Sequence, residues 1–231
     1  MSQLLFCFPN GGGTSSVYAG WTAALLPAFR VRRVVLPGRE TLADEAPLTG
    51  CGELVARLLS DLVPHVSQPY AIFGHSMGAL VGYEIACALR DAGHPEPTSL
   101  VVSACPAPGV PRRARQYHAE SEEALVDLVR TMGGVPEEIL ASREYLDFML
   151  PLLRADLQVL ETYQFTPRSA LSCPIVVLGG QADPICVPGN LDAWHSLTTG
   201  PCQTHLLPGG HFYLFEQRQA FLDVLQKQLV R

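Results

Sequence analysis

Short apolar runs alternate along the chain with longer segments whose apolar residues recur at helical spacing. The short runs predict β-strands over residues 4–8, 31–36, 70–74, 99–104, 174–180 and 203–207. The longer segments predict helices over residues 16–29, 52–63, 77–92 and 217–230. Strands that alternate with helices in this order are typical of an α/β fold, in which helices flank a mostly parallel central sheet.

One stretch of the chain interrupts this alternation, because residues from about 107 to 168 contain no convincing strand. They carry two apolar helical faces instead: Leu125, Leu128, Val129 and Met132, then Leu146, Met149, Leu150, Leu153, Leu157 and Leu160. We interpret the stretch as a helical insertion within a single domain of residues 1–231. It would lie over the carboxyl edge of the sheet, where open α/β sheets bind ligands. A lid over a site is therefore expected, with helices that merely complete the core as the alternative.

Composition favours a well-packed protein that does not bind nucleic acid. Hydrophobic residues make up 48% of the 231 positions and charged residues 16%, which suits a chain with a large core. The formal net charge is −6. This charge argues against a nucleic-acid partner, because neutralising phosphates requires a surplus of lysine and arginine.

The termini and cysteines bear on location and on metal binding. The N-terminal sequence MSQLLFCFPN has neither the basic leader nor the cleavage site of a signal peptide. No apolar run approaches the roughly 18 residues that span a bilayer. The seven cysteines are odd in number and include no C-x-x-C pair, and Cys7 and Cys173 lie beside or within strand-like runs, where thiols are usually buried and reduced. We therefore expect a cytoplasmic protein that does not cross a membrane. No His, Cys and Asp cluster has ligand spacing, so neither a metal nor a cofactor is expected.

The first sign of chemistry is the sequence GHSMG at residues 74–78, which fits the pattern G-x-S-x-G. An apolar strand precedes it and a helical pattern follows it. Ser76 would therefore stand on a sharp strand-to-helix turn with its hydroxyl exposed. Side chains at Gly74 and Gly78 would collide there with neighbouring backbone. A serine that only caps a helix is the alternative, but it would not explain both glycines.

A serine nucleophile requires a base and an orienting carboxylate, which in this kind of site follow in the order serine, acid, histidine. Among seven histidines, His211 is the candidate base, because it follows a strand end and a glycine turn. Asp183 is the candidate acid, because it follows the strand and glycine turn of PIVVLGGQ. Asp156, on the helical insertion, is the rival acid.

Acyl transfer also requires two backbone N–H groups aimed at the developing negative charge. Met77 follows the nucleophile at a helix N-terminus and is one expected donor. Gly11, within the glycine-rich sequence FPNGGG, is the other. A phosphate-binding loop does not fit this glycine run, because it lacks G-K-[ST] and lacks G-x-G-x-x-G with correct spacing to a helix.

Taken together, the motifs of the chain resemble those of the type II thioesterases, stand-alone α/β-hydrolases that accompany polyketide synthases and nonribosomal peptide synthetases. The motifs are, in chain order, CFPNGGG, LPGRE, GHSMGAL, LPLLRADLQVLETY, GGQADP and LPGGHFYL. The resemblance spans essentially the whole chain and implies the α/β-hydrolase fold. It also implies hydrolysis of acyl thioesters from the phosphopantetheine arm of acyl or peptidyl carrier proteins. The family's catalytic residues fall on Ser76, Asp183 and His211, and its oxyanion donors on Gly11 and Met77.

The glycine loop departs from the family pattern. Relatives commonly read Phe-Pro-His/Tyr-Ala-Gly-Gly, whereas Asn10 and Gly11 fill the middle positions here. The backbone donor is kept, and the loop is expected to be more flexible. A chain-releasing thioesterase or a carboxylesterase on the same three residues is the alternative enzyme, and a non-catalytic binding protein is the alternative outside catalysis.

A basic cluster of Arg112, Arg113 and Arg115 begins the helical insertion. An acidic carrier protein or the phosphate of its pantetheine arm could dock there. A solvated loop without a partner is the commoner explanation of such a cluster.

Overall fold

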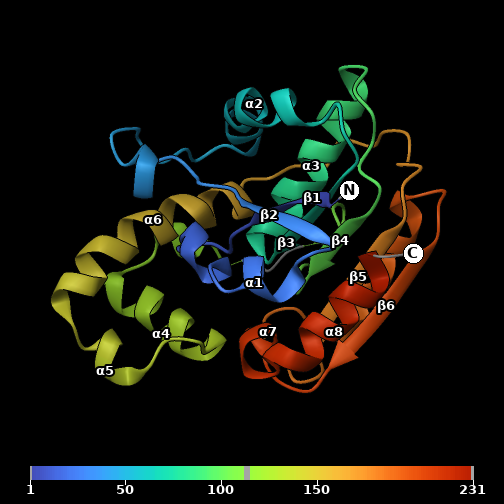
Figure 1. The fold of residues 1–231 in the computed structure, drawn as a ribbon. Helices are drawn as coiled ribbons and strands as arrows, with labels where there is room; N and C mark the ends of the chain where they lie inside the picture. Colours follow the sequence, from blue (N-terminus) through green and yellow to red (C-terminus); the bar gives the residue numbers. More distant parts are fainter. Residues whose placement is uncertain (1, 112–114, 230–231) are drawn as a thin grey trace.

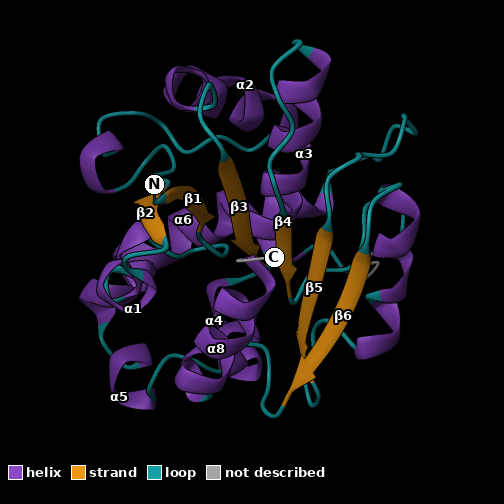
Figure 2. Ribbon diagram, turned by 45° about the vertical axis from the view of Figure 1, so that its right-hand side comes forward, coloured by secondary structure: helices purple, strands orange, loops and turns teal. Residues whose placement is uncertain are grey.

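The centre of the protein is a six-stranded sheet with the strand order β2-β1-β3-β4-β5-β6, seen in a computed structural model that describes residues 2–111 and 115–229. The strands are β1 (Gln3–Phe8), β2 (Phe29–Arg33), β3 (Tyr70–His75), β4 (Leu100–Ser103), β5 (Ile175–Gly180) and β6 (Cys202–Leu207). Every neighbouring pair is parallel, and Figure 2 shows the strands side by side. The predicted α/β fold is confirmed.

Helices lie on both faces of this sheet (Figure 1). The α-helices of the described residues are α1 (Trp21–Leu25), α2 (Cys51–Leu62), α3 (Met77–Asp91), α4 (Glu122–Met132), α5 (Glu137–Leu140), α6 (Arg143–Glu161), α7 (Tyr213–Glu216) and α8 (Arg218–Leu229). Short 3-10 helices cover Ser15–Tyr18, Glu40–Leu42, Val63–His65, Tyr117–Ala119, Pro188–Asn190 and Asp192–Leu197. No helix in the described ranges has both the length and the apolar character needed to cross a membrane.

The core has two halves because successive side chains of a strand point to opposite faces of the sheet. Phe6 and Ile72 belong to the half that packs against α2 and α3. Leu5 and Phe73 belong to the other half, which packs against α1 and α8. Both faces are covered, and this explains why the central strands read as continuous apolar runs rather than as alternating patterns.

The segment after β1 differs from the sequence prediction. A single helix over residues 16–29 is wrong: the structure has the 3-10 helix Ser15–Tyr18 and then the short α1. Gly20 separates the two, and glycine is a poor helix former. Leu26 is extended because it precedes Pro27, and a residue before proline avoids the helical region.

The second strand also begins earlier than the predicted 31–36, because Phe29 pairs with Gln3 at the start of β1. Val34 and Leu36, which belong to the predicted strand, are buried in the core beyond the end of β2. The N–H of Val34 still donates to the carbonyl of Cys7 in β1, whereas Leu36 is buried without pairing in the sheet. The other predicted strands and helices lie within two residues of the observed bounds.

The stretch between β4 and β5 contains α4, α5 and α6, and no strand occurs among its described residues. The two predicted apolar faces meet in one cluster, where Leu125 and Val129 of α4 pack with Met149 and Leu153 of α6. α4 and α5 lie at one side of the molecule (Figure 1), and α6 extends from them to the core, where Val159 is fully buried. Their action as a lid, and the single domain of residues 1–231, stay predictions.

Candidate active site

Ser76 stands on the turn between β3 and α3, with φ 54° and ψ −119°, a conformation that few non-glycine residues adopt. Gly74 and Gly78 are required for the predicted reason, because side chains at these positions would collide with backbone. A Cβ at Gly74 would lie 2.1 Å from the carbonyl oxygen of Gly78. A Cβ at Gly78 would lie 2.3 Å from the carbonyl oxygen of Phe8, in the neighbouring β1. The strained conformation of Ser76 is therefore possible only because residues 74 and 78 have no side chains.

The three candidate residues Ser76, His211 and Asp183 form one continuous chain of hydrogen bonds. His211 Nε2 lies 3.1 Å from Ser76 Oγ, and His211 Nδ1 lies 2.8 Å from Asp183 Oδ2. Asp183 Oδ1 accepts the N–H groups of Ile185 at 2.8 Å and Cys186 at 3.0 Å. His211 and Asp183 are only 1% and 3% exposed. The carboxylate is thereby fixed in orientation, and it fixes the imidazole in turn.

The loops after β5 and β6 meet because two glycine turns pack against each other. A Cβ at Gly180 would lie 2.1 Å from the carbonyl oxygen of Gly210, so a side chain there would push the loops apart. The N–H of Gln181 donates to the carbonyl of Leu207, and the N–H of Ala182 donates to that of Gly209. These contacts bring Asp183 and His211 together although they lie 28 residues apart in the chain.

The glycine loop after β1 lies beside the nucleophile turn. A Cβ built on Gly11 would be 4.0 Å from Met77 Cβ, so the two candidate oxyanion donors are near neighbours. Met77 is the first residue of α3, where a backbone N–H has no acceptor within the helix. Among the described residues, the N–H of Gly11 likewise has no backbone acceptor. Both N–H groups are therefore available to a negatively charged oxygen near Ser76.

A buried ion pair holds this loop, and the sequence analysis missed it. Arg39 and Asp156 form two hydrogen bonds of 2.8 and 2.9 Å, and their residues are 1% and 2% exposed. Asp156 Oδ2 also accepts the N–H of Gly12 at 2.7 Å, while Arg39 donates to the carbonyl of Gly13 at 2.8 Å. Asp156 is thus occupied by the loop, and Asp183 is the acid that contacts His211. An aspartate on the apolar face of a helix, between Leu153 and Leu157, was the signal in the sequence.

His75, next to the nucleophile, is a second group that the sequence analysis did not assign. Its Nδ1 lies 2.9 Å from Ser103 Oγ, which in turn lies 2.6 Å from Tyr213 Oη. The rings of His75 and His211 are 5.1 Å apart between centroids. Complete burial, and then the charge that His211 can carry, hold the pKa of His75 well below its ordinary value. His75 is therefore a neutral ring that packs against the candidate base.

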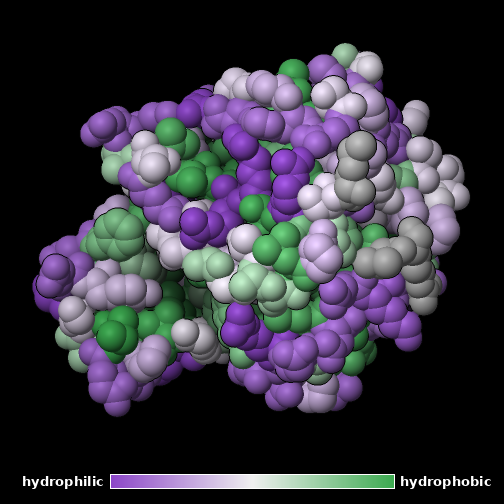
Figure 3. Space-filling view, in the orientation of Figure 1, coloured by the Kyte–Doolittle hydropathy of each residue, from purple (hydrophilic) through white to green (hydrophobic). Residues whose placement is uncertain are grey.

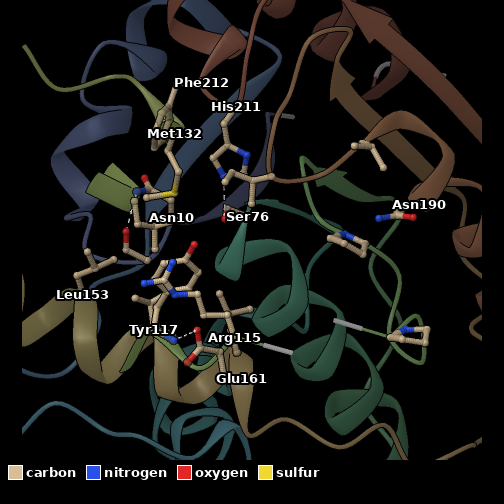
Figure 4. A pocket seen from close by; sticks show the side chains of 18 residues that line it. Asn10, Ser76, Arg115, Tyr117, Met132, Leu153, Glu161, Asn190, His211 and Phe212 are labelled. Atoms are coloured by element: carbon tan, nitrogen blue, oxygen red, sulfur yellow. Dashed lines mark hydrogen bonds between the residues drawn. The ribbon is translucent and has the colours of Figure 1, made fainter. Parts of the chain in front are cut away.

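A cavity of about 280 Å³ opens over Ser76 and His211. Its apolar lining comes largely from the helical insertion, with Leu128, Met132, Leu153, Leu157 and Leu160. Arg115, Tyr117 and Glu161 form a polar part of the wall (Figure 4). In the space-filling view, apolar side chains border a hollow between α4–α6 and the rest of the molecule (Figure 3). The cavity suits a ligand with an apolar chain and a polar arm.

The basic cluster is only partly within the described residues, because Arg112 and Arg113 lie outside them. Arg115 contacts Glu120 at 3.2 Å and lies 4.6 Å from the centre of the Tyr117 ring. Its side chain is 52% exposed, so the guanidinium is a surface charge at the cavity rim. Docking of a carrier protein at this cluster stays a prediction.

Three features define the α/β-hydrolase class: a parallel sheet, a serine at a strand-to-helix turn, and a histidine and an aspartate after neighbouring strands. All three occur here. A family model described as a thioesterase domain matches residues 3–229. The gramicidin S biosynthesis protein GrsT of Aneurinibacillus migulanus is 34% identical over 225 residues, covering 97% of this chain and 88% of that protein. The chain therefore belongs to the thioesterase family, and it is a thioester hydrolase as the sequence predicted.

Solved structures agree with this assignment. RedJ, a thioesterase from the prodiginine biosynthetic pathway in Streptomyces coelicolor, is 39% identical and has a TM-score of 0.93 over 97% of this chain and 89% of that one. The type II thioesterase BorB, from the borrelidin biosynthetic cluster, is 38% identical and has a TM-score of 0.91 over 99% of this chain and 93% of that one. The predicted resemblance to type II thioesterases is confirmed.

Proposed function

We propose that the chain is an editing thioesterase that removes acyl groups from the phosphopantetheine arm of acyl or peptidyl carrier proteins. Ser76 is the nucleophile, His211 the general base and Asp183 the orienting acid. The observation that carries this assignment is the unbroken contact from Ser76 Oγ through the His211 ring to Asp183, at the wall of a largely apolar cavity.

Acylation follows from this geometry. Ser76 Oγ attacks the thioester carbonyl while His211 Nε2 takes the hydroxyl proton, and Asp183 stabilises the imidazolium that forms. The oxyanion accepts hydrogen bonds from the N–H groups of Gly11 and Met77, and loss of one such donor typically costs about 3–4 kcal/mol of transition-state stabilisation. The carbon–sulfur bond then breaks, the thiol leaves with the proton from His211, and the acyl group stays on Ser76.

Deacylation repeats the same steps with water. Water attacks the acyl-serine carbonyl, His211 takes a proton from the water, and the same two N–H groups hold the oxyanion. Collapse of this intermediate releases the carboxylic acid and returns the proton to Ser76 Oγ. Each residue thus acts twice, and the enzyme ends the cycle in its starting state.

The proposed substrate class rests on the cavity and on the relatives. GrsT, RedJ and BorB are named for the biosynthesis of gramicidin S, prodiginine and borrelidin. In the cavity wall, Arg115, Tyr117 and Glu161 offer hydrogen-bonding groups to the amides and phosphate of a pantetheine arm. The apolar remainder offers space to the acyl chain.

The test is a panel of carrier proteins loaded with acyl chains of different length and branching, with released acid measured for each. We expect hydrolysis by the wild type, loss of hydrolysis in Ser76→Ala, and full activity in the control Ser196→Ala, whose serine is exposed and does not line the cavity. Oxygen esters of matched chain length are assayed in parallel. Much faster hydrolysis of the oxygen esters would identify a carboxylesterase, and no labelling of Ser76 by a fluorophosphonate would indicate a binding protein.

A further inference from the structure

A second cavity, of about 220 Å³, lies behind the wall of the first. It is lined by both sides of the glycine loop, by α4 and α6, and by the segment after His211. The two cavities share five lining residues, which are Asn10, Gly11, Met132, Leu153 and Phe212. These shared residues form a partition with the nucleophile on one side and the second cavity, bordered by the exposed Gly134 and Phe215, on the other.

The side chains that line the second cavity are mostly apolar, with Asn10 and Tyr145 as the polar ones, and no charged side chain lines it among the described residues. Val17, Val129, Val135 and Met149 contribute to its wall without lining the first cavity. A cavity without a positively charged side chain does not favour the phosphate of a pantetheine arm, because the phosphate would lose hydrogen bonds to water without gaining a counter-charge. It suits a hydrocarbon chain.

Phe212 is the fixed part of the partition. Its ring stacks on Phe215 at 5.9 Å and meets the His211 ring edge-on at 5.3 Å between centroids. A Cβ at Gly134 would lie 2.6 Å from the Phe212 ring, and Gly134 has φ +84°, so backbone packs directly against this phenylalanine. Phe212 therefore has little room to move away.

Met132 is the part of the partition that determines how far an acyl chain can extend from Ser76. It is the last residue of α4 and is half-buried. Its side chain packs against the core half that contains Phe212 and also against the cluster between α4 and α6. Figure 4 shows Met132 beside Phe212 and Asn10, at the same end of the cavity as His211, with Arg115 and Glu161 at the opposite end. An acyl chain that runs from Ser76 away from the polar part of the wall would thus end at Met132.

We propose that Met132 sets the chain-length limit of this enzyme, and that the second cavity is a subsite for the distal methylenes of a long acyl chain once that side chain is shortened. The inference rests on the proposed function, because it assumes an acyl group attached to Ser76. The wild type then prefers acyl chains that end before the partition. Removal of the methionine side chain joins the two cavities.

The experiment compares kcat/KM of Met132→Ala on a series of straight-chain acyl thioesters, from butyryl to dodecanoyl, with that of the wild type. Each methylene that gains a buried position contributes about fourfold, as follows from roughly 0.8 kcal/mol per methylene. Two or three such methylenes predict that the ratio of dodecanoyl to butyryl turnover rises by about 15- to 60-fold. Met132→Val, a milder truncation, is expected to shift the ratio in the same direction by less.

The control Met149→Ala truncates a more deeply buried methionine, which lines the second cavity alone, and so tests whether loosening between α4 and α6 changes the ratio by itself. We expect its chain-length ratio to equal that of the wild type, because the partition is intact. Adding Val135→Phe to Met132→Ala refills the second cavity and is expected to reverse the gain. Folding of each variant is checked by thermal unfolding.

Failure of the inference and failure of the proposed function give different results. A wild type that hydrolyses acyl thioesters, together with an unchanged ratio in Met132→Ala and Met132→Val, would overturn the chain-length role of Met132. An equal rise in Met149→Ala would overturn it too, since general loosening would then be the cause. A wild type that hydrolyses no acyl thioester would instead refute the proposed function itself.

Discussion

Replacing Asp156 with asparagine would leave the guanidinium of Arg39 buried without its counter-charge. The carboxylate accepts three donors, two from Arg39 and one from the N–H of Gly12. An asparagine has one acceptor oxygen, so its amide N–H₂ would face at least one of these donors. Removing one partner of a buried ion pair costs about 3–5 kcal/mol of unfolding free energy.

We therefore expect Asp156→Asn to fold but to melt earlier. A loss of about 3 kcal/mol corresponds to roughly 6–12 °C for a chain of this size, and typical domains have about 5–15 kcal/mol in total. The kcat should fall by about 10- to 100-fold, because the loop that carries Gly11 loses the acceptor of Gly12. This is less than the roughly 10²–10³-fold loss on complete removal of an oxyanion donor. The KM should change little, since the acyl cavity keeps its lining.

The assay combines thermal unfolding by circular dichroism with kcat and KM on one short acyl thioester at 25 °C. Glu45→Gln is the matched control, because it removes a carboxylate from the more exposed pair with Arg57 and such pairs contribute little. Its melting temperature and kcat should equal those of the wild type. If Asp156→Asn melts with the wild type and retains its kcat, the pair does not hold the glycine loop.

Three further changes test other parts of the site. Asp183→Asn should keep the fold and lower kcat by about 10⁴-fold in a thioesterase assay, because the histidine tautomer is no longer fixed; a near-normal kcat would contradict the role of Asp183. Gly74→Ala should abolish soluble expression, because the new Cβ would collide with the carbonyl of Gly78. The control Gly52→Ala has open space around it and should raise the unfolding free energy by up to about 1 kcal/mol in urea titrations. A soluble, active Gly74→Ala would refute the close approach of residue 74 to the Gly78 carbonyl. His75→Gln should reduce the acid sensitivity of stability below pH 6.5: the folded state keeps His75 neutral while the unfolded chain takes up a proton, so the wild type loses up to about 1.4 kcal/mol per pH unit from this residue. Above pH 6.5 His75 is unprotonated in both the folded and the unfolded state, so this contribution to the pH dependence disappears. Equal slopes of stability against pH for the wild type and His75→Gln below pH 6.5 would contradict a neutral His75 in the folded state.

The strands and the nucleophile turn could be predicted from the sequence because their signals are local. The buried strands are uninterrupted apolar runs, and the two glycines around Ser76 are required by backbone contacts within one turn and with β1. Asp183 and His211 could be chosen because each follows a strand and a glycine turn. Such positions lie at the same edge of a parallel sheet whatever the details of the loops.

The remaining features depend on contacts between distant segments, which local patterns do not contain. Arg39 and Asp156 lie 117 residues apart and become partners only when α6 packs over the glycine loop. Met132 has the same apolar character as its neighbours on α4, and its place between two cavities follows from tertiary packing. The wrong helix over residues 16–29 has a related cause: its apolar content reflects burial of Tyr18, Trp21 and Leu25 in the core.

The most direct test of the central claim is to trap the acyl-enzyme. The wild type and Ser76→Ala are mixed briefly with an acyl-loaded carrier protein and quenched in acid, and their peptides are mapped by mass spectrometry. The account predicts an acyl group on the peptide that contains Ser76 in the wild type, and neither this adduct nor released acid with Ser76→Ala. Acid released by Ser76→Ala at the wild-type rate, or an acyl group carried by another residue of the wild type, would contradict it.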